Sequence, residues 1–413
     1  MKKVIKNIAV NRKQLKVKNY KDFFNHALNL LVKEDMVDCG YGHEIVSNDI
    51  FFTPNKIFYL DEQVYYHKGD KLYCLENKGE REVCTIGYDE TCATQIIYGG
   101  IRANLFINSS GAKLVDGKIS MSVSWVDADI ATEHNGRLFS AKNRIITFSE
   151  PFDFETQSIP LKVSGSLRVD RQAGSVVGFF SNGNTLYIFC QRAVYTLQTG
   201  FESIDFIFKK EQNFAFEITI NSFATFADGV YFVGNNKLYK FTKSKLVELS
   251  RLLDISDCTK TSYAGFYDGI YCLPLIFNEG ENNYLYVYDT ENGAESLISM
   301  QTGISYAGHY FLGNKIVKIS RGESISTDGR VYSKIFYLSD KGEVDLYEIS
   351  FYAGESGKLS VQSKTGVANF SIKKGFNAVS TLLPSEQFKV EFSTNKKGFS
   401  VKELCLKYIE KGE

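Results

Sequence analysis

The histidines and cysteines are the residues of this chain best suited to bind metals or to act as nucleophiles. No two histidines lie within five residues of each other, and no two cysteines form a C-x-x-C pair. Metal sites built from one short segment need spacings such as H-E-x-x-H or C-x-x-C. The sequence therefore predicts no local metal site, although a site assembled from distant segments stays open. The residues concerned are His26, His43, His67, His134, His309, Cys39, Cys74, Cys84, Cys92, Cys190, Cys258, Cys272 and Cys405.

Carboxylates and a single tryptophan are the remaining candidates for chemistry. Glu150, Asp153 and Glu155 cluster in SEPFDFETQ, and paired carboxylates are the machinery of glycosidases. We interpret this cluster as a solvated loop after a strand, and Trp125 as a core or interface residue rather than a sugar platform. The chain has neither a glycine-rich phosphate loop nor a G-x-S-x-G elbow. We therefore expect no catalytic residues, no cofactor, no metal and no enzymatic activity, and we interpret the cysteines as free, mostly buried thiols.

Composition and charge limit the classes of partner. The 413 residues include 25 Tyr and 32 Phe, and such aromatic side chains favour strands. The 48 basic and 48 acidic residues give zero net charge, whereas proteins that coat duplex DNA usually carry excess positive charge. The N-terminus lacks the apolar region of a signal peptide, and no run of 18 apolar residues occurs. We expect no membrane association and folding in a cytoplasm.

The first 21 residues form a basic segment without an acidic residue. Such a segment is a solvated terminus, or an arm that docks on a neighbouring subunit or on packaged nucleic acid. Residues 20–33 follow it with apolar residues at helical spacing, which predicts one short helix, and 249–255 is a second helical candidate. The basic residues are Lys2, Lys3, Lys6, Arg12, Lys13, Lys16, Lys18 and Lys21.

A repeated pattern begins near residue 50. Short strands alternate with Asn-Gly or Asp-Gly turns, which tolerate the positive φ angles of tight hairpins. The turn glycines Gly136, Gly183, Gly229, Gly269 and Gly313 are separated by 47, 46, 40 and 44 residues. That period matches a four-stranded propeller blade of roughly 40–50 residues. The region 50–345 then holds about 6.7 periods, which predicts six or seven blades.

The last segment has a different pattern. Residues 346–413 lose the turn phase and hold five short strands, which indicates a β-sandwich-like domain. The fold class expected is all-β: a six- or seven-bladed β-propeller with a C-terminal β-sandwich-like domain and a short N-terminal arm. The expected domains are 1–48 for the arm and helix, 49–345 for the propeller, and 346–413 for the sandwich-like domain.

One stretch resembles a known group of proteins. His134-Asn135-Gly136-Arg137-Leu138-Phe139 is followed by Ile145–Glu150 and then Asp153-Phe154. This resembles the H-x-x-R-L-F/W strand, the second strand ending in Ser, and the DF loop of tailed-bacteriophage propeller proteins. Residues 243–256 are similar to a segment often found midway through such propellers. The group includes tail nozzle, tail-hub and packaged-DNA stabilisation proteins.

The resemblance implies a structural virion protein of a tailed bacteriophage. It would be a ring-forming component of the tail or neck, assembled in the host cytoplasm and located in the virion. Its partners would be other copies of itself and other tail, portal or adaptor proteins, with non-specific contact to packaged DNA through the basic arm. The alternative is a propeller binding module that recognises a host-surface glycan or protein. A hydrolase or lyase would require convergent carboxylates or histidines in the central pocket.

Overall fold

The computed structural model describes most of the chain as β-structure. It describes residues 12–410 except 34, 48–49, 51–55, 77–78, 89–90, 109, 118, 125, 155–164, 201, 203–204, 228, 243–244, 250–257, 259, 262, 278–281, 301–304, 307–308, 313–314, 321–328 and 341. Within these residues the helical segments are α1 (Tyr20–Phe23), the 3-10 turn η2 (Arg171–Ala173) and single 3-10 residues at Phe154 and Asp205. None of them has the length or apolar character that a membrane-spanning helix needs.

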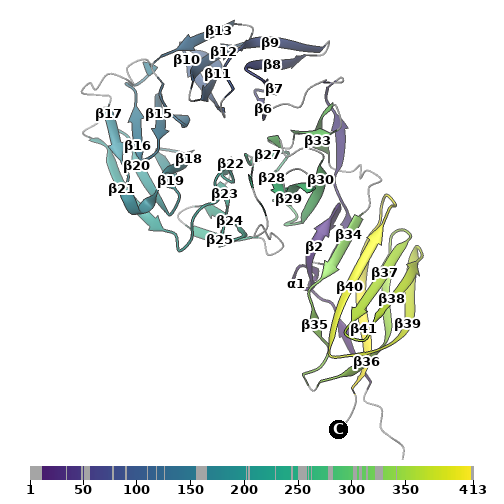
Figure 1. Ribbon diagram of the computed structural model, residues 1–413. Helices are drawn as coiled ribbons and strands as arrows, with labels where there is room; N and C mark the ends of the chain where they lie inside the picture. Colours follow the sequence, from purple (N-terminus) through teal and green to yellow (C-terminus); the bar gives the residue numbers. More distant parts are fainter. Residues whose placement is uncertain are drawn as a thin grey trace, which may run out of the picture.

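Seven blades form a ring around a central channel (Figure 1). Six are separate four-stranded antiparallel sheets, and the sixth blade along the chain belongs to a larger sheet. The expected propeller is thus confirmed, with seven blades. The strands of blades 1 to 3 are β6 (Lys56–Leu60), β7 (Gln63–Lys68), β8 (Lys71–Glu76), β9 (Gly79–Thr85); β10 (Cys92–Tyr98), β11 (Ile101–Asn108), β12 (Gly111–Asp116), β13 (Ile119–Val123); and β14 (Ile130–His134), β15 (Arg137–Lys142), β16 (Ile145–Phe148), β17 (Gly165–Arg168).

The other blades follow in chain order. The strands of blades 4 and 5 are β18 (Val176–Asn182), β19 (Thr185–Cys190), β20 (Ala193–Gln198), β21 (Ile207–Asn213), β22 (Ala224–Phe226), β23 (Gly229–Gly234), β24 (Lys237–Thr242) and β25 (Lys245–Glu248). Those of blades 6 and 7 are β26 (Lys260–Thr261), β27 (Gly265–Tyr267), β28 (Ile270–Phe277), β29 (Asn282–Asp289), β30 (Glu295–Met300), β31 (Ser305–Tyr306), β32 (His309–Leu312), β33 (Lys315–Ser320) and β5 (Gly42–Ile45).

The N-terminal part of the chain closes the ring. The outer strand of blade 7 is β5, which pairs antiparallel with β33 and places Ile45 opposite Val317. The Nζ of Lys318 lies 3.1 Å from a carboxylate oxygen of Glu44 across the same ladder. Closure matters because each blade buries its faces against its neighbours, so an open ring would expose apolar surface.

Gly136, Gly183 and Gly269 have the positive φ that the sequence pattern predicts for the turn glycines, whereas Gly229 does not. Asn135 and Gly136 have φ values of 50° and 72°, and Asp268 and Gly269 have 49° and 72°. Both pairs join the first two strands of a blade. Gly313, the last turn glycine of the predicted repeat, lies outside the described residues.

Aromatic side chains fill the space between blades. The rings of Phe58 and Phe106 meet edge-on at 5.4 Å between blades 1 and 2. Phe189 of blade 4 lies 5.9 Å from Phe232 of blade 5. Such pairs stabilise beyond the area that they bury. The high Phe and Tyr content is therefore explained by the inter-blade core.

A β-sandwich forms the second domain. Its first sheet, called here sheet S1, has the order β38 (Val367–Ile372), β37 (Gly357–Ser363), β40 (Gln387–Thr394), β34 (Gly329–Ser333) and β2 (Phe24–Leu28), with β35 (Phe336–Tyr337) also on β40. Its second sheet, called S2, has β39 (Gly375–Ser385), β36 (Val344–Ala353), β41 (Val401–Glu410) and β1 (Arg12–Lys16), with β4 (Met36–Cys39) on β41 and β3 (Leu30–Val32) on β4. Phe351 of S2 and Phe392 of S1 meet at 5.1 Å in the core between the sheets.

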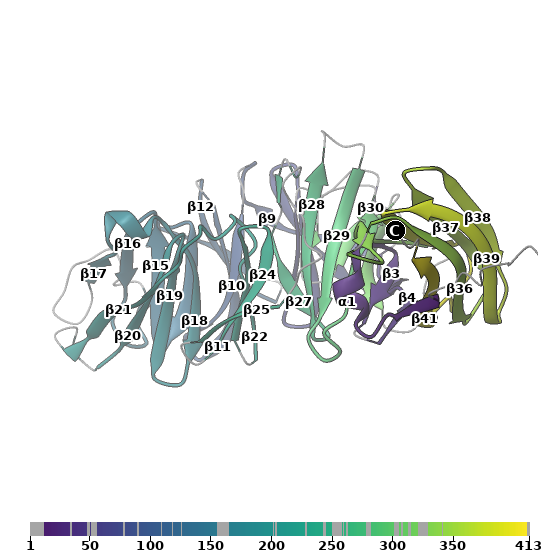
Figure 2. The ribbon, with the colours of Figure 1, turned by 90° about the horizontal axis from the view of Figure 1, so that it is seen from below.

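The sandwich joins the propeller at the outer strand of blade 6. Leu28 of β2 pairs in parallel with Leu297 of β30, and the Asn29 amide donates to the Leu297 carbonyl at 2.7 Å. Tyr41 donates a hydrogen bond to the buried carboxylate of Asp289 at 2.8 Å, close to this junction. Figures 1 and 2 agree that the sandwich lies at the rim, so it covers neither mouth of the channel.

The structure groups the ends of the chain differently from the expected 1–48, 49–345 and 346–413. Strands β1 to β4 belong to the sandwich and β5 belongs to the propeller. The helix predicted for 20–33 is wrong beyond Phe23, because this segment forms β2 and β3, where pairing in the sheet overrides helical spacing. The second helical candidate, 249–255, falls almost wholly outside the described residues.

Candidate functional site

The central channel is the largest hollow among those that we describe. Its wall comes from the inner strands of six blades and their flanking residues, and its volume is about 650 Å³. Among its described lining residues, only Lys56 and Asp129 carry a formal charge. Polar residues of the wall include Thr94, Gln95, Thr132, Ser175, Gln191, Asn221, Thr225 and Tyr263.

Both charged groups of the channel interact with the propeller framework. The buried Lys56 amine donates to the carbonyl oxygen of Thr91 at 2.5 Å and lies over the ring of Tyr263. A carboxylate oxygen of Asp129 accepts from the Asn143 amide at 3.3 Å. The described channel wall therefore holds one carboxylate and no histidine, which does not make an acid–base pair.

The channel also contains a thiol, Cys92. Burial raises the pKa of this thiol, so it stays protonated at neutral pH and is a poor nucleophile. The cysteines whose side chains are described are all free, at Cys74, Cys84, Cys92, Cys190, Cys258, Cys272 and Cys405. No group of three His, Cys, Asp or Glu side chains in the described ranges is arranged to hold a metal.

The residues that carry the phage resemblance form the framework of blade 3. Arg137 is 1% exposed, and its Nη1 donates to the Ser149 carbonyl at 2.7 Å. The Ser149 hydroxyl accepts from the Leu138 amide at 3.0 Å, and the Phe152 amide donates to the Gly136 carbonyl at 2.6 Å. These bonds tie the loop after β16 to the β14–β15 hairpin. The spacing of these residues in the sequence therefore has a structural explanation.

His134 contacts the neighbouring blade without the geometry of a catalytic dyad. Its Nδ1 lies 2.7 Å from the hydroxyl of Ser181, and the Asn135 side-chain amide lies 3.2 Å from its Nε2. Asn135 donates to Nε2, so the proton is on Nδ1 and Ser181 is the acceptor. Burial also lowers the pKa of His134. A general base would instead have to accept the serine proton.

The carboxylate cluster is a turn rather than a paired site. Glu150 and Asp153 form an isolated bridge after β16 of blade 3, and Phe154, the next residue, is 3% exposed and packs in a hydrophobic cluster with Leu138. Glu155 and Trp125 lie outside the described residues. The sugar-platform alternative for Trp125 thus stays untested.

The basic residues of the expected arm lie partly on a sheet edge. Arg12, Lys13 and Lys16 belong to β1, whose side chains are all exposed, and Lys18 follows it. The amine of Lys13 lies 2.7 Å from Glu410 on β41, and this hydrogen bond raises the pKa of Lys13. Charged residues on an edge strand discourage edge-to-edge aggregation. Lys2, Lys3 and Lys6 lie outside the described residues.

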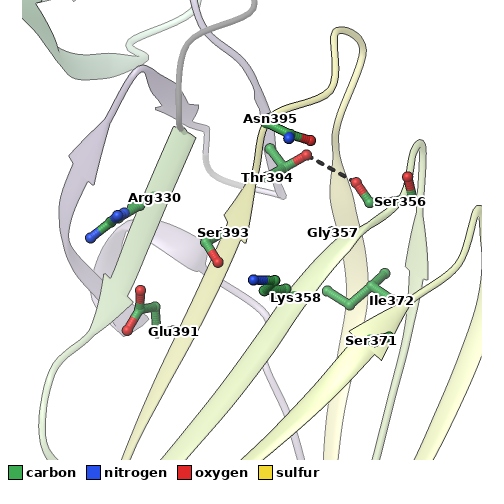
Figure 3. A pocket seen from close by; sticks show the side chains of 10 residues that line it. All are labelled: Arg330, Ser356, Gly357, Lys358, Ser371, Ile372, Glu391, Ser393, Thr394 and Asn395. Carbon is green, nitrogen blue, oxygen red and sulfur yellow. Dashed lines mark hydrogen bonds between the residues drawn. The ribbon is translucent and has the colours of Figure 1, made fainter.

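A second hollow lies on the outer face of sheet S1, and we call it the sandwich hollow. Figure 3 shows Lys358 on β37 reaching toward Ser393 on β40, with Arg330 on β34 beyond Ser393. Its volume is about 560 Å³, within the roughly 300–1,000 Å³ typical of ligand pockets. It is lined by Arg330, Ser356, Gly357, Lys358, Ser371, Ile372, Glu391, Ser393, Thr394 and Asn395.

Strand alternation places the polar groups of the sandwich hollow. Leu359 and Phe392 point into the sandwich core and are fully buried, so Lys358, Glu391 and Ser393 point outward. The strands KLSVQS and FKVEFST alternate polar and apolar residues, as half-buried strands do. Sequence reasoning found these strands but missed the hollow, because it could not place the strands side by side.

Comparisons with known proteins identify no family for this chain. No family model and no curated protein matches this sequence. The chain is similar to PorZ of Porphyromonas gingivalis, a bacterial surface component of the type-IX secretion system, at 13% identity and TM-score 0.40 over 87% of this chain and 46% of that one. This chain thus spans less than half the length of PorZ.

Two further solved structures show similarly low scores. The Neurospora crassa Pan2 WD40 domain matches at 9% identity and TM-score 0.41, over 66% of this chain and 90% of that one. The β-propeller domain of the Trilobed protease from Pyrococcus furiosus, described as having an open velcro topology, matches at 12% identity and TM-score 0.33, over 75% and 94%.

Proposed function

We propose that this β-propeller protein is a non-enzymatic structural component of a tailed-bacteriophage virion, in the tail or neck. It would assemble into a homo-oligomeric ring and contact other tail, portal or adaptor proteins. The observation that carries the proposal is the use of residues 134–154 in blade 3. Arg137 and Ser149, two positions of the phage-like pattern, bond to each other and hold the blade together. The resemblance thus concerns residues that determine the fold of a blade.

The exposed apolar residues of the blade edges supply contact surfaces for assembly. Ile119 is 71% exposed and Met121 is 40% exposed, both on β13, the outer strand of blade 2. Ile207 on the outer strand of blade 4 is 58% exposed. Outer strands with apolar side chains are suited to bind another chain. Both charged groups of the channel wall interact with the propeller itself, and this favours a role in assembly over a role in catalysis.

Ring formation can be tested with purified protein. Light scattering coupled to size exclusion should show one oligomer of fixed size, and negative-stain images should show closed rings. The double variant Ile119→Asp/Met121→Asp should dissociate the ring, while Ile145→Asp, on β16 of blade 3 and 48% exposed, should leave it intact. A wild-type protein that stays monomeric at high concentration, and that is absent from particles, would contradict the proposal.

A binding module is the second candidate, because the sandwich hollow offers a polar site outside the propeller. Lys358, Ser393 and Glu391 face this hollow from two neighbouring strands (Figure 3). Under this candidate the protein recognises a glycan or protein on a host surface. Binding of isolated protein to host cells, lost when the hollow is altered, would favour it over a pure scaffold.

A further inference from the structure

The sandwich hollow places two cations on either side of one hydroxyl. In the ladder, Arg330 pairs with Ser393, and Ser393 pairs with Lys358. Neighbouring strands lie about 4.8 Å apart, so the backbones of Arg330 and Lys358 are roughly 10 Å apart with Ser393 midway. The Lys358 side chain is long enough to reach an anionic group above Ser393, whereas the Arg330 side chain extends away from Ser393 in Figure 3. Figure 3 shows the Lys358 amine directed toward that position.

Several polar groups of the hollow have unused hydrogen-bonding capacity. Within the described part of the chain, the side chains of Lys358, Ser371, Glu391, Ser393 and Asn395 make no hydrogen bond or ion pair. Their partner in the free protein is solvent, which a ligand with matching groups can replace. A ligand rich in hydroxyl groups fits this mixture of donors and acceptors.

Glu391 restricts the kind of anion that the hollow can accept. It lies one row below Ser393 on the same face, since Glu391 pairs with Ser360 and with Tyr332. A polyanion that runs along β40 would bring a second negative charge close to this carboxylate, which is unfavourable. A ligand with one anionic group and neutral hydroxyls beyond it would instead donate to Glu391.

We propose that the sandwich hollow binds a hydroxyl-rich ligand with a single oxyanionic group, namely a saccharide that carries a carboxylate. Lys358 contacts the carboxylate, Ser393 donates to it, and Glu391 accepts from a sugar hydroxyl. The proposal deepens the binding-module candidate and is independent of ring assembly. Failure of the ligand proposal therefore does not contradict ring assembly, and failure of ring assembly does not contradict ligand binding, because binding and oligomeric state are measured separately.

The test uses the full chain with 3′-sialyllactose, which has one carboxylate, and with its methyl ester, which has none. Calorimetry should show an affinity for the acid at least about tenfold higher than for the ester, as expected for a charge-assisted hydrogen bond. Lys358→Met should remove this preference. The matched control Lys402→Met, an exposed lysine on β41 of the other sheet, should keep it.

Two further measurements locate the site and identify the source of the charge. Hydrogen exchange should show ligand-induced protection at residues 356–361 and 391–395. Lactose 3′-sulfate, which also carries a single negative charge, should bind about as tightly as the carboxylate sugar. A short DNA duplex, which is a polyanion, should bind more weakly than either sugar, and Glu391→Gln should strengthen its binding.

Each of the following outcomes would overturn the proposal. They are equal affinity for acid and ester, equal losses in Lys358→Met and Lys402→Met, protection confined to other segments, and DNA binding that is tighter than sugar binding and insensitive to Glu391→Gln. Thermal unfolding of each variant checks that it is folded. Misfolding is not expected, because the substituted positions are on the sheet surface. If wild-type protein binds neither sugar at millimolar concentration, the proposal is wrong whatever the oligomeric state.

Discussion

Ile45 and Val317 lie opposite each other in the ladder that closes the propeller, although they come from opposite ends of the propeller sequence. The same N-terminal segment supplies strands to the sandwich before it reaches blade 7. One short segment therefore connects the two domains and closes the ring. Loss of this pairing would expose the faces of blades 7 and 1.

A disulfide across the closing ladder should stabilise the ring. Glu44 pairs with Lys318, and paired Cα atoms in antiparallel strands lie about 4.5–5.5 Å apart, within disulfide range. The double variant Glu44→Cys/Lys318→Cys should form this bond on oxidation and raise the midpoint of thermal unfolding, by an amount equivalent to several kcal/mol at most. Reduction should remove the gain. A pair that stays reduced, or a gain also seen in Glu44→Cys alone, would contradict the closing role of β5.

Arg137 should stabilise blade 3 through its hydrogen bond. Arg137→Met removes the donor and leaves the Ser149 carbonyl without this partner inside the protein. An unsatisfied buried acceptor costs about 1–3 kcal/mol, so denaturant unfolding should show a loss of about 2 kcal/mol. Arg168→Met, an exposed position on β17 of the same blade, should change stability by less than about 0.5 kcal/mol. An equal loss of stability in both variants would contradict a specific stabilising role of Arg137.

Gly178 should be essential for the contact between blades 4 and 5. A Cβ added at Gly178 would lie much closer to the Phe223 ring than van der Waals contact allows and would force the ring to move. Gly178→Ala should destabilise the protein by about 1–3 kcal/mol, as overpacked cores do. Gly366→Ala, where the added Cβ meets nothing within 4 Å, is the control and should be nearly neutral. Denaturant titration of both variants measures the difference.

Buried histidines should make stability depend on pH near neutrality. Desolvation lowers the pKa of His67 and His134 below the ordinary value of 6.5. Below pH 6.5 the unfolded chain therefore binds more protons than the folded protein, and folding stability is lost as the pH falls. Thermal unfolding from pH 7.5 to 5.5 should show this decline. The double variant His67→Gln/His134→Gln should reduce the slope of stability against pH. An unchanged slope would mean that other groups cause the decline.

The repeat of turn glycines predicted the propeller because its cause is local. Gly136 and Gly269 need positive φ in two-residue turns, and this requirement is visible in the sequence. The position of residues 24–32 could not be predicted in the same way. Phe24, Leu28 and Leu31 have helical spacing, but the burial of Phe24 depends on pairing with distant strands of the sandwich.

The candidate site was harder to predict from the sequence than the fold was. The strands that hold Lys358 and Glu391 were expected, but β39 was not, and it separates β38 from β40 along the chain. Placing Arg330 beside Ser393 requires the order of strands in sheet S1, which periodicity does not reveal. The basic residues of 1–21 were visible as a charge run, yet only the structure pairs Lys13 with Glu410.

The proposed role in a virion is tested most directly by quantitative mass spectrometry of purified phage particles from a host whose genome encodes this chain. The account predicts that peptides of this protein copurify with the particles at a fixed ratio to tail and portal proteins, consistent with a ring of defined size. Peptides found only in the particle-free fraction, with none in intact virions, would contradict it.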